Sequence, residues 1–229
     1  MHGFSNLELF ILLLGVPMAL GMWAQFRVKG AFGKYSKVRA SSNATGAQAA
    51  REILHAAGIS DVDVVRIDGM LGDHYDPMHK RLCLSTDVYN SPSVAALGIA
   101  AHESGHAIQH AVSYAPLKAR MAVVPVTMFA SQLLPFVMIG GLFFGIVGLL
   151  KLGVIIYAIL AAFQLITLPV EFDASRRAKI ILQNMHLIQP GTEATGVNRV
   201  LDAAALTYVA AFVAALGNLI YLFLLSRRE

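Results

Sequence analysis

Charged residues and cysteine are scarce in this sequence. Asp, Glu, Lys and Arg make up 14% of the 229 residues, whereas a soluble domain usually carries about 25%. Hydrophobic residues make up 56%, and the mean hydropathy is +0.61. This composition argues against an ordinary soluble enzyme and favours a chain that lies largely in a lipid bilayer. The one cysteine, Cys83, excludes an intrachain disulfide, and its alternating apolar surroundings favour a buried structural thiol.

Basic residues are in slight excess, but they lack the pattern of a nucleic-acid-binding protein. The net charge is +4, no basic run exceeds two residues, and aromatic residues are not interleaved with the basic ones. We therefore expect no nucleic-acid partner. Lys and Arg beside apolar runs are interpreted instead as membrane topology signals.

Four apolar runs are long enough to cross a membrane as helices. They are Leu7–Phe26, Met121–Leu150, Leu152–Val170 and Ala203–Leu225. The second run is longer than one span needs, and Pro125 and Pro135 are where an interfacial piece could separate from it. Lys151 interrupts the second and third runs, which must form a tight helical hairpin. The first run has no basic segment before it, which favours a signal anchor over a cleaved signal peptide.

These runs divide the chain into five parts. They are an N-terminal anchor (1–26), a polar segment (27–120), a transmembrane hairpin (121–170), a second polar segment (171–202) and a C-terminal span with its tail (203–229). With four spans, both polar segments lie on one side of the membrane and hold 15 of the 18 Lys and Arg residues. Because basic residues are enriched in cytoplasmic loops, we expect both segments to face the cytoplasm.

The first polar segment contains signals for both helices and strands. The predicted elements are a helix over Thr45–Ala57 after the capping cluster 41–43 and before Gly58, strands over Val62–Ile67 and Arg81–Ser85 with a polar loop at 73–77 between them, and a helix from Ser93 through His110. The predicted fold is therefore a mainly α membrane protein, with four transmembrane helices and a small cytoplasmic α+β domain.

The stretch 100–110, AAHESGHAIQH, contains the pattern H-E-x-x-H within a predicted helix. Residues four apart share one helix face, so His102 and His106 can reach one zinc ion. Glu103 can accept a proton from a zinc-activated water and pass it to the leaving amine. Gly105 costs about 1 kcal/mol in mid-helix relative to Ala, which indicates a close approach there. The competing interpretation is a helix with two surface histidines.

A catalytic zinc ion usually has three protein ligands and one open position. His110 continues the same helix face, but it lies about 12 Å along the axis from His102 and is a poor third ligand. Glu171 immediately follows the third span, so it emerges on the same side of the membrane as the histidines. It could otherwise stabilise a helix N-terminus. We predict that Glu171 is the third ligand.

Four sequence patterns occur in a characteristic order. They are D-H-Y-D-P at 73–77, V-Y-x-x-x-S-V-A-A at 88–96, A-A-H-E-x-G-H-A-I-Q-H at 100–110 and L-P-V-E-F-D-A-S-R-R-A at 168–178. Together they resemble the YugP-type neutral zinc metallopeptidases of prokaryotic membranes, over nearly the whole chain. The layout is also similar to that of HtpX-type membrane peptidases, in which H-E-x-x-H precedes a transmembrane hairpin and a glutamate ligand follows it on the cytoplasmic side.

The resemblance implies Zn²⁺ at His102, His106 and Glu171, Glu103 as the base, and a zincin-like catalytic domain. It also implies protein or peptide substrates, without deciding between soluble chains and membrane proteins, and a location in the prokaryotic cell membrane. The HtpX-type pattern has an aspartate four residues after the glutamate, where it orients a histidine. Here that position is Ser175, and an aspartate, Asp173, lies two residues after Glu171. Both therefore stay open as the partner of a histidine.

A peptidase also needs a hydrogen-bond donor for the oxyanion and a surface that binds the substrate. A donor for the oxyanion is expected, and the candidates are His74, Tyr75, His110, Arg176 and Arg177. By analogy with other zincins, Arg81–Ser85 is the predicted edge strand for an extended substrate.

Two other functions compete with peptide hydrolysis. A membrane scaffold or metal-handling protein with a structural zinc site would normally supply four ligands, often including cysteine, and only three credible ligands exist here. A transporter would place ionisable residues inside its spans, and the four runs contain only Glu8, at one end. Hydrolysis is therefore preferred.

Overall fold

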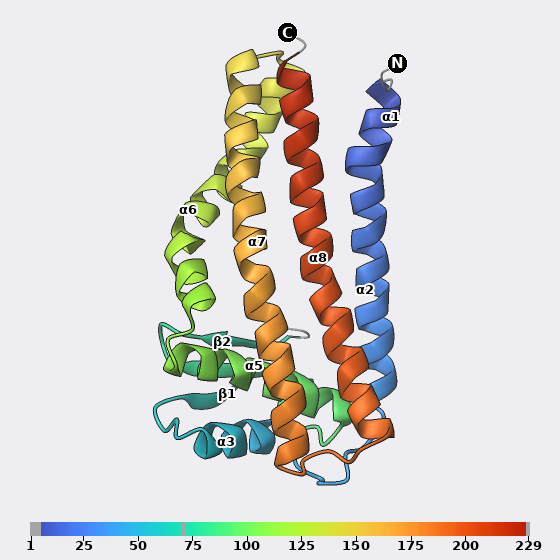
Figure 1. The fold of residues 1–229 in the computed structure, drawn as a ribbon, viewed down its shortest axis with the longest axis vertical. Helices are drawn as coiled ribbons and strands as arrows, with labels where there is room; N and C mark the ends of the chain where they lie inside the picture. Colours follow the sequence, from blue (N-terminus) through green and yellow to red (C-terminus); the bar gives the residue numbers. More distant parts are fainter. Residues whose placement is uncertain (1–5, 70–71, 228–229) are drawn as a thin grey trace. The chain divides into compact units, whose positions relative to one another are not determined.

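The computed structural model describes residues 6–69 and 72–227 of the chain, which are mainly helical with one small sheet (Figure 1). In chain order the elements are α1 (Asn6–Phe10), the π-helical turn η1 (Ile11–Gly15), α2 (Val16–Tyr35), α3 (Gly46–Ala56), β1 (Asp63–Ile67), β2 (His74–Asp76), β3 (Arg81–Ser85), α4 (Thr86–Tyr89), α5 (Val94–Ala111), α6 (Ala115–Met138), the π-helical turn η2 (Ile139–Phe143), α7 (Val147–Asn184) and α8 (Thr192–Ser226).

Four helical stretches of the described chain are long and apolar enough to cross a membrane. They are Leu7–Tyr35, Ala115–Phe143, Val147–Asn184 and Thr192–Ser226. Between 11% and 22% of the residues in their most apolar windows are buried by the protein. Apolar side chains that the protein leaves uncovered need lipid as their solvent. The four predicted spans thus correspond to four observed helices, which favour a multi-pass membrane protein.

The turn between the second and third spans lies before Lys151, not at it. It falls at 144–146, between η2 and α7, and Lys151 lies inside α7. Gly145 has a φ of +64°, a left-handed conformation that glycine adopts without steric cost. One lysine near a helix end does not interrupt backbone hydrogen bonding, because lysine is a good helix former, and its long side chain can carry the charge to water. The expectation of a break at Lys151 was therefore wrong.

Pro125 and Pro135 both lie inside α6 and do not divide it into two helices. Each proline removes one backbone donor. Membrane helices accommodate such breaks in the hydrogen-bond ladder through neighbouring groups and local adjustment. No interfacial piece separates from the second span.

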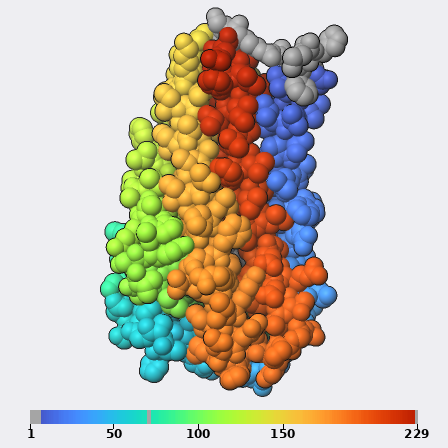
Figure 2. Space-filling view, viewed as in Figure 1, coloured from blue at the N-terminus to red at the C-terminus, as the bar shows by residue number. Residues whose placement is uncertain are grey.

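The chain forms two compact units. Of the described residues, the helical unit comprises 6–25, 119–168 and 206–227, and the α+β unit comprises 26–69, 72–118 and 169–205. In the helical unit, small residues allow close packing. A Cβ atom on Gly217 would lie 2.2 Å from the carbonyl oxygen of Leu13, and one on Gly153 would lie 3.2 Å from Leu222. The upper parts of α7 and α8 accordingly lie side by side (Figure 2).

The sheet of the α+β unit has the strand order β1-β3-β2. β1 runs parallel to β3, with Val65 opposite Cys83, and β2 runs antiparallel to β3, with Tyr75 opposite Leu82. The predicted edge strand, Arg81–Ser85, is therefore the central strand, which corrects the expectation. β2 is an edge, and it forms where a loop was expected. The carboxylate of Asp73 accepts hydrogen bonds from the backbone N–H and the hydroxyl of Ser85, which anchors the start of β2 to the end of β3.

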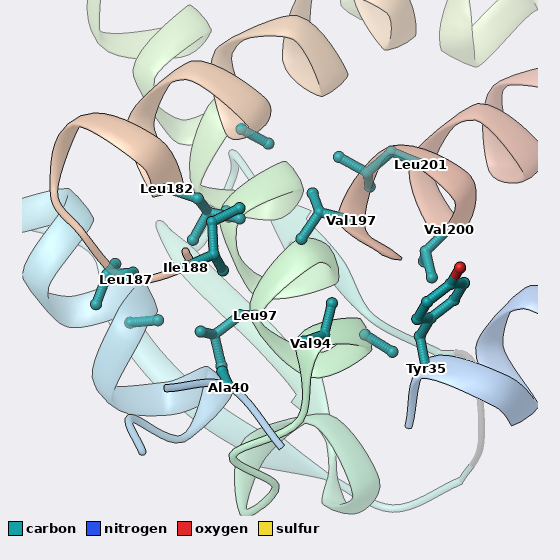
Figure 3. Close-up of a cluster of buried hydrophobic side chains, with 14 of the residues drawn as sticks. Tyr35, Ala40, Val94, Leu97, Leu182, Leu187, Ile188, Val197, Val200 and Leu201 are labelled. Atoms are coloured by element: carbon teal, nitrogen blue, oxygen red, sulfur yellow. The ribbon is translucent and has the colours of Figure 1, made fainter. Parts of the chain in front are cut away.

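Helix α5 is buried on two faces, and this fixes its position. One face carries small residues such as Ala96 and Ala100, which pack with Leu82 and Leu84 of β3. The other face contributes to a second cluster, shown in Figure 3, that gathers side chains from α5, α7, α8 and the end of α2. Its labelled members are Tyr35, Ala40, Val94, Leu97, Leu182, Leu187, Ile188, Val197, Val200 and Leu201. Burial of this kind stabilises by about 25 cal/mol per Å² of apolar surface removed from water.

The start of α3 differs slightly from the predicted cap. Thr45 is the N-cap residue: its hydroxyl accepts from the backbone N–H of Gln48, whose side chain accepts from the N–H of Thr45. This reciprocal pair satisfies two donors at the helix start. The capping cluster predicted at 41–43 lies just before it.

Candidate metal centre

The two histidines of the H-E-x-x-H pattern lie one turn apart on α5. Ser93 caps this helix, with its hydroxyl accepting from the N–H of Ala96. The rings of His102 and His106 have centroids 4.8 Å apart at an interplanar angle of 82°. Each side chain is 11% exposed. Two shielded imidazoles therefore face one small volume from a rigid helix.

The side chain of Glu171, near the middle of α7, lies close to both histidines. Its Oε2 atom lies 3.2 Å from Nε2 of His102 and 3.6 Å from Nε2 of His106, and its side chain is 2% exposed. Donor atoms of a tetrahedral zinc ion, with bonds of about 2.0–2.2 Å, are about 3.3 Å apart. The observed separations match that spacing. Among residues 6–69 and 72–227, these three form the one group of three or more potential ligands whose donor atoms lie within 4.8 Å of one another.

A glycine lets α5 and α7 come this close. A Cβ atom on Gly105 would lie 2.9 Å from the carbonyl oxygen of Ala174 and 3.2 Å from its Cα atom. The position is therefore occupied by backbone of α7, three residues after Glu171. The close approach that Gly105 indicated in the sequence is thus present, and it brings the Glu171 side chain against the histidines.

His106 is oriented by a residue that the sequence interpretation overlooked. Its Nδ1 atom lies 3.0 Å from Oε1 of Gln109, which is completely buried. The amide nitrogen of Gln109 in turn donates to the carbonyl oxygen of Val170 at 2.8 Å and to Oδ2 of Asp173 at 2.9 Å. The signal was present in the sequence, because Gln109 follows His106 by three residues and shares its helix face.

His102 has a different partner. The hydroxyl oxygen of Ser175 lies 3.1 Å from Nδ1 of His102. The Oε1 atom of Gln109 can only accept, so His106 donates to it from Nδ1. The Ser175 hydroxyl can pair with Nδ1 of His102 in either direction, according to the tautomer of the ring. The two candidates left open by the sequence therefore serve different histidines. Ser175 contacts His102 directly, and Asp173 acts on His106 through Gln109.

Glu103 lies next to His102 on α5 and is 8% exposed. Burial raises the pKa of its carboxyl group above the ordinary value; the two imidazoles oppose this shift, and the nearby carboxylates of Glu171 and Asp73 add to it. Burial likewise raises the pKa of Asp73, against the hydrogen bonds from Ser85. A raised pKa makes the carboxylate of Glu103 a stronger base than an exposed one.

The five candidate oxyanion donors have other partners. Arg176 and Arg177 both donate to Asp173. Tyr75 and His110 share a hydrogen bond of 2.8 Å, beside a separate cavity of about 190 Å³. The ring of His74 lies 2.7 Å from the carbonyl oxygen of Gly72. His110 is thus engaged with β2 and is not among the three grouped ligands.

Comparison with known proteins also indicates a zinc-binding protein. Residues 10–227 match the family described as "Putative neutral zinc metallopeptidase". The chain is also similar to the "Putative membrane protease YugP" of Bacillus subtilis (strain 168), with 48% identity over 224 residues, which cover 96% of this chain and 99% of that protein. No solved structure matches the chain. Such a family implies Zn²⁺ as the cofactor, and His102, His106 and Glu171 provide a donor set that suits this ion.

Proposed function

Because this chain belongs to the neutral zinc metallopeptidase family, we propose that it is an integral membrane metalloendopeptidase whose catalytic centre contains His102, Glu103, His106 and Glu171. The observation that carries this proposal is the convergence of two imidazole nitrogens and one carboxylate oxygen at distances of 3.2 Å and 3.6 Å. Three ligands leave a tetrahedral ion one open position, whereas a structural site normally has four. The donor set therefore favours catalysis over a scaffold or metal-handling role.

The residues of the proposed catalytic centre have different roles. His102, His106 and Glu171 would hold the ion, with Ser175 and Gln109 fixing the two rings. A bound zinc ion supplies a Lewis acid that polarises the peptide carbonyl and acidifies water. Glu103 accepts a proton from the attacking water and delivers it to the nitrogen of the leaving amine.

The edge strand β2 is the surface on which we place an extended substrate. An extended peptide can add to a free strand edge through backbone hydrogen bonds. β1 is the other edge, but β2 is tied to the metal-centre helix, because Tyr75 of β2 bonds to His110 of α5. A peptide paired with β2 would lie along the helix that carries both histidines, which is a zincin-like arrangement.

The orientation in the membrane is inferred from charge. The α+β unit contains the metal centre, and the segments 27–120 and 171–202 carry 15 of the 18 Lys and Arg residues. The bias of basic residues toward cytoplasmic loops supports a catalytic centre that faces the cytoplasm of a prokaryotic cell.

The test compares purified wild-type protein with Glu103→Gln on membrane extracts, and peptides released are identified by mass spectrometry. The exposed Glu52 of α3 provides a matched control, Glu52→Gln. We expect Glu103→Gln to retain zinc but to lower turnover by about 10²–10⁴-fold, and Glu52→Gln to behave as wild type. Equal peptide release by wild type and Glu103→Gln would refute the mechanism. Full zinc occupancy with no peptide released by wild type would favour the structural-zinc alternative.

A further inference from the structure

A second cavity lies in the α+β unit between α2 and α8, outside the metal centre. Its volume is about 610 Å³. The lining residues come from one face of each helix: Arg27, Gly30, Ala31, Lys34 and Tyr35 from α2, and Thr195, Arg199 and Ala203 from α8. The spacings of three, four and seven residues on α2, and of four on α8, are those of a single helix face.

The cavity is strongly basic. Arg27, Lys34 and Arg199 line it, and among the residues that the structure describes no Asp or Glu does. The nearest acidic residues of α8 in sequence are bonded elsewhere: Glu193 accepts from Ser41, and Asp202 accepts from Lys179. Thr195 adds a hydroxyl donor to the lining. Three cations and a hydroxyl around an open volume suit a phosphate group.

The cavity is also open. A Cβ atom on Gly30 would have no atom of the protein within 4 Å. The side chains of Arg27, Lys34 and Arg199 are exposed. The basic side chains that line the cavity can therefore be reached from outside the protein.

The setting points to lipid as the source of the phosphate. From Leu9 in α1 to Phe26 in α2 the chain carries no charge, and Arg27 follows directly. Along α8, the charge-free run begins at Ala203, four residues after Arg199. The basic positions thus lie where both helices change from membrane-compatible to polar sequence. Phe26, beside Arg27, is 74% exposed, which offers an apolar surface to an acyl chain.

We propose that the cavity lined by Arg27, Lys34 and Arg199 binds the phosphate of an anionic phospholipid headgroup from the membrane leaflet that these residues border. The shared chemistry is a phosphate, and inorganic phosphate is the competing source. Basic pockets between transmembrane helices are known to select anionic headgroups, and each Lys or Arg near the surface contributes about a fivefold gain in binding.

The chain carries its own reporter for this site. Trp23 is the single tryptophan, it is 48% exposed, and it lies four residues before Arg27 on α2, about 6 Å along the axis on the same face. The full chain is reconstituted in phosphatidylcholine vesicles that contain rising fractions of brominated phosphatidylglycerol or, in parallel, brominated phosphatidylcholine. We expect the anionic lipid to quench Trp23 fluorescence at a severalfold lower mole fraction.

Two sets of variants distinguish binding in the cavity from a general effect of positive charge. Arg27→Gln and Arg199→Gln should each reduce the lipid preference by about fivefold, while Lys29→Gln, which removes an exposed cation of α2 outside the cavity, should retain it. Gly30→Phe should fill the cavity and abolish the preference, while Gly33→Phe should retain it. A Cβ atom on either glycine meets no protein atom within 4 Å, so neither substitution clashes at its Cβ atom.

Three outcomes would overturn the proposal. Equal quenching of the wild type by both brominated lipids shows that no anionic lipid is selected. Equal loss of preference in Lys29→Gln and Arg27→Gln shows a general charge effect. If inorganic phosphate at constant ionic strength removes the preference, the cavity takes free phosphate and the lipid assignment fails. The readout does not depend on peptidase activity, so it is independent of the proposed function.

Discussion

The amide oxygen of Gln109 lies 3.0 Å from Nδ1 of His106, on the side of the ring opposite to the nitrogen that faces Glu171. The nitrogen of the same amide donates to the carboxylate of Asp173, which also accepts a hydrogen bond from Arg177. A neutral side chain therefore stands between the imidazole and the carboxylate. Gln109 fixes the orientation of the His106 ring, and the negatively charged Asp173 contacts Gln109 instead of His106.

Gln109→Ala should weaken zinc binding. The substitution removes the acceptor for His106 and leaves the buried Asp173 without one of its donors. Loss of a group that orients a metal ligand typically lowers metal affinity by about 10–100-fold. Competition with a chromogenic zinc chelator measures the effect, and Gln183→Ala, at an exposed position of α7, is the control. Equal zinc affinity in the two variants would show that Gln109 does not position the ligand.

Ser175→Ala should also weaken zinc binding, through His102 rather than His106. The hydroxyl of Ser175 is the partner of Nδ1 of His102, and without it the ring can rotate away from Glu171. We expect about a tenfold loss of affinity. Ser104→Ala is the matched control, because that buried hydroxyl on α5 donates only to the backbone oxygen of Ala100. A similar loss in Ser104→Ala would indicate a general packing effect.

The candidate ligands could be chosen from the sequence, and Ser175 and Asp173 were candidates for the groups behind them, but their assignment to one histidine each could not be predicted. Helical periodicity places His102 and His106 on one face, and the order of the spans brings Glu171 to the same side of the membrane. Their grouping is observed, and their roles as ligands stay a prediction. The part played by Gln109 depends on which side-chain rotamer meets which ring, and spacing alone does not determine that.

In the fold, too, long sequence patterns predicted the observed elements and short ones did not. Apolar runs of about 20 residues predicted four membrane helices, and the helix that carries the histidines was predicted to within a residue or two. β2 has only three residues, and the bond between the Asp73 carboxylate and Ser85 next to it joins residues 12 apart in the sequence. The turn at Gly145 leaves no mark in hydropathy, whereas Lys151 is a visible charge in an apolar run, so charge alone predicts the wrong break.

Gly105→Ala should destabilise the protein, although alanine usually stabilises a helix. The new methyl group would lie 2.9 Å from the carbonyl oxygen of Ala174, so α5 and α7 must move apart. Overpacking of this kind costs about 1–3 kcal/mol. Gly98→Ala on the same helix is the control: its methyl group would meet the Val197 side chain at 3.7 Å, an ordinary contact. Thermal unfolding in detergent should show a lower midpoint for Gly105→Ala only, together with lower zinc occupancy.

Tyr75→Phe should raise KM with little change in kcat, because the Tyr75 hydroxyl links the edge strand β2 to His110 on α5. The ring and its packing remain in this variant, so the sheet should persist while its registration against the metal-centre helix loosens. One hydrogen bond contributes about 1 kcal/mol, which corresponds to about a fivefold rise in KM for a peptide that pairs with β2. Tyr89→Phe is the control, since the Tyr89 hydroxyl accepts from Arg51 on α3. A fall in kcat at unchanged KM would instead make Tyr75 part of the chemical step, and equal KM values in both variants would remove β2 as the substrate strand.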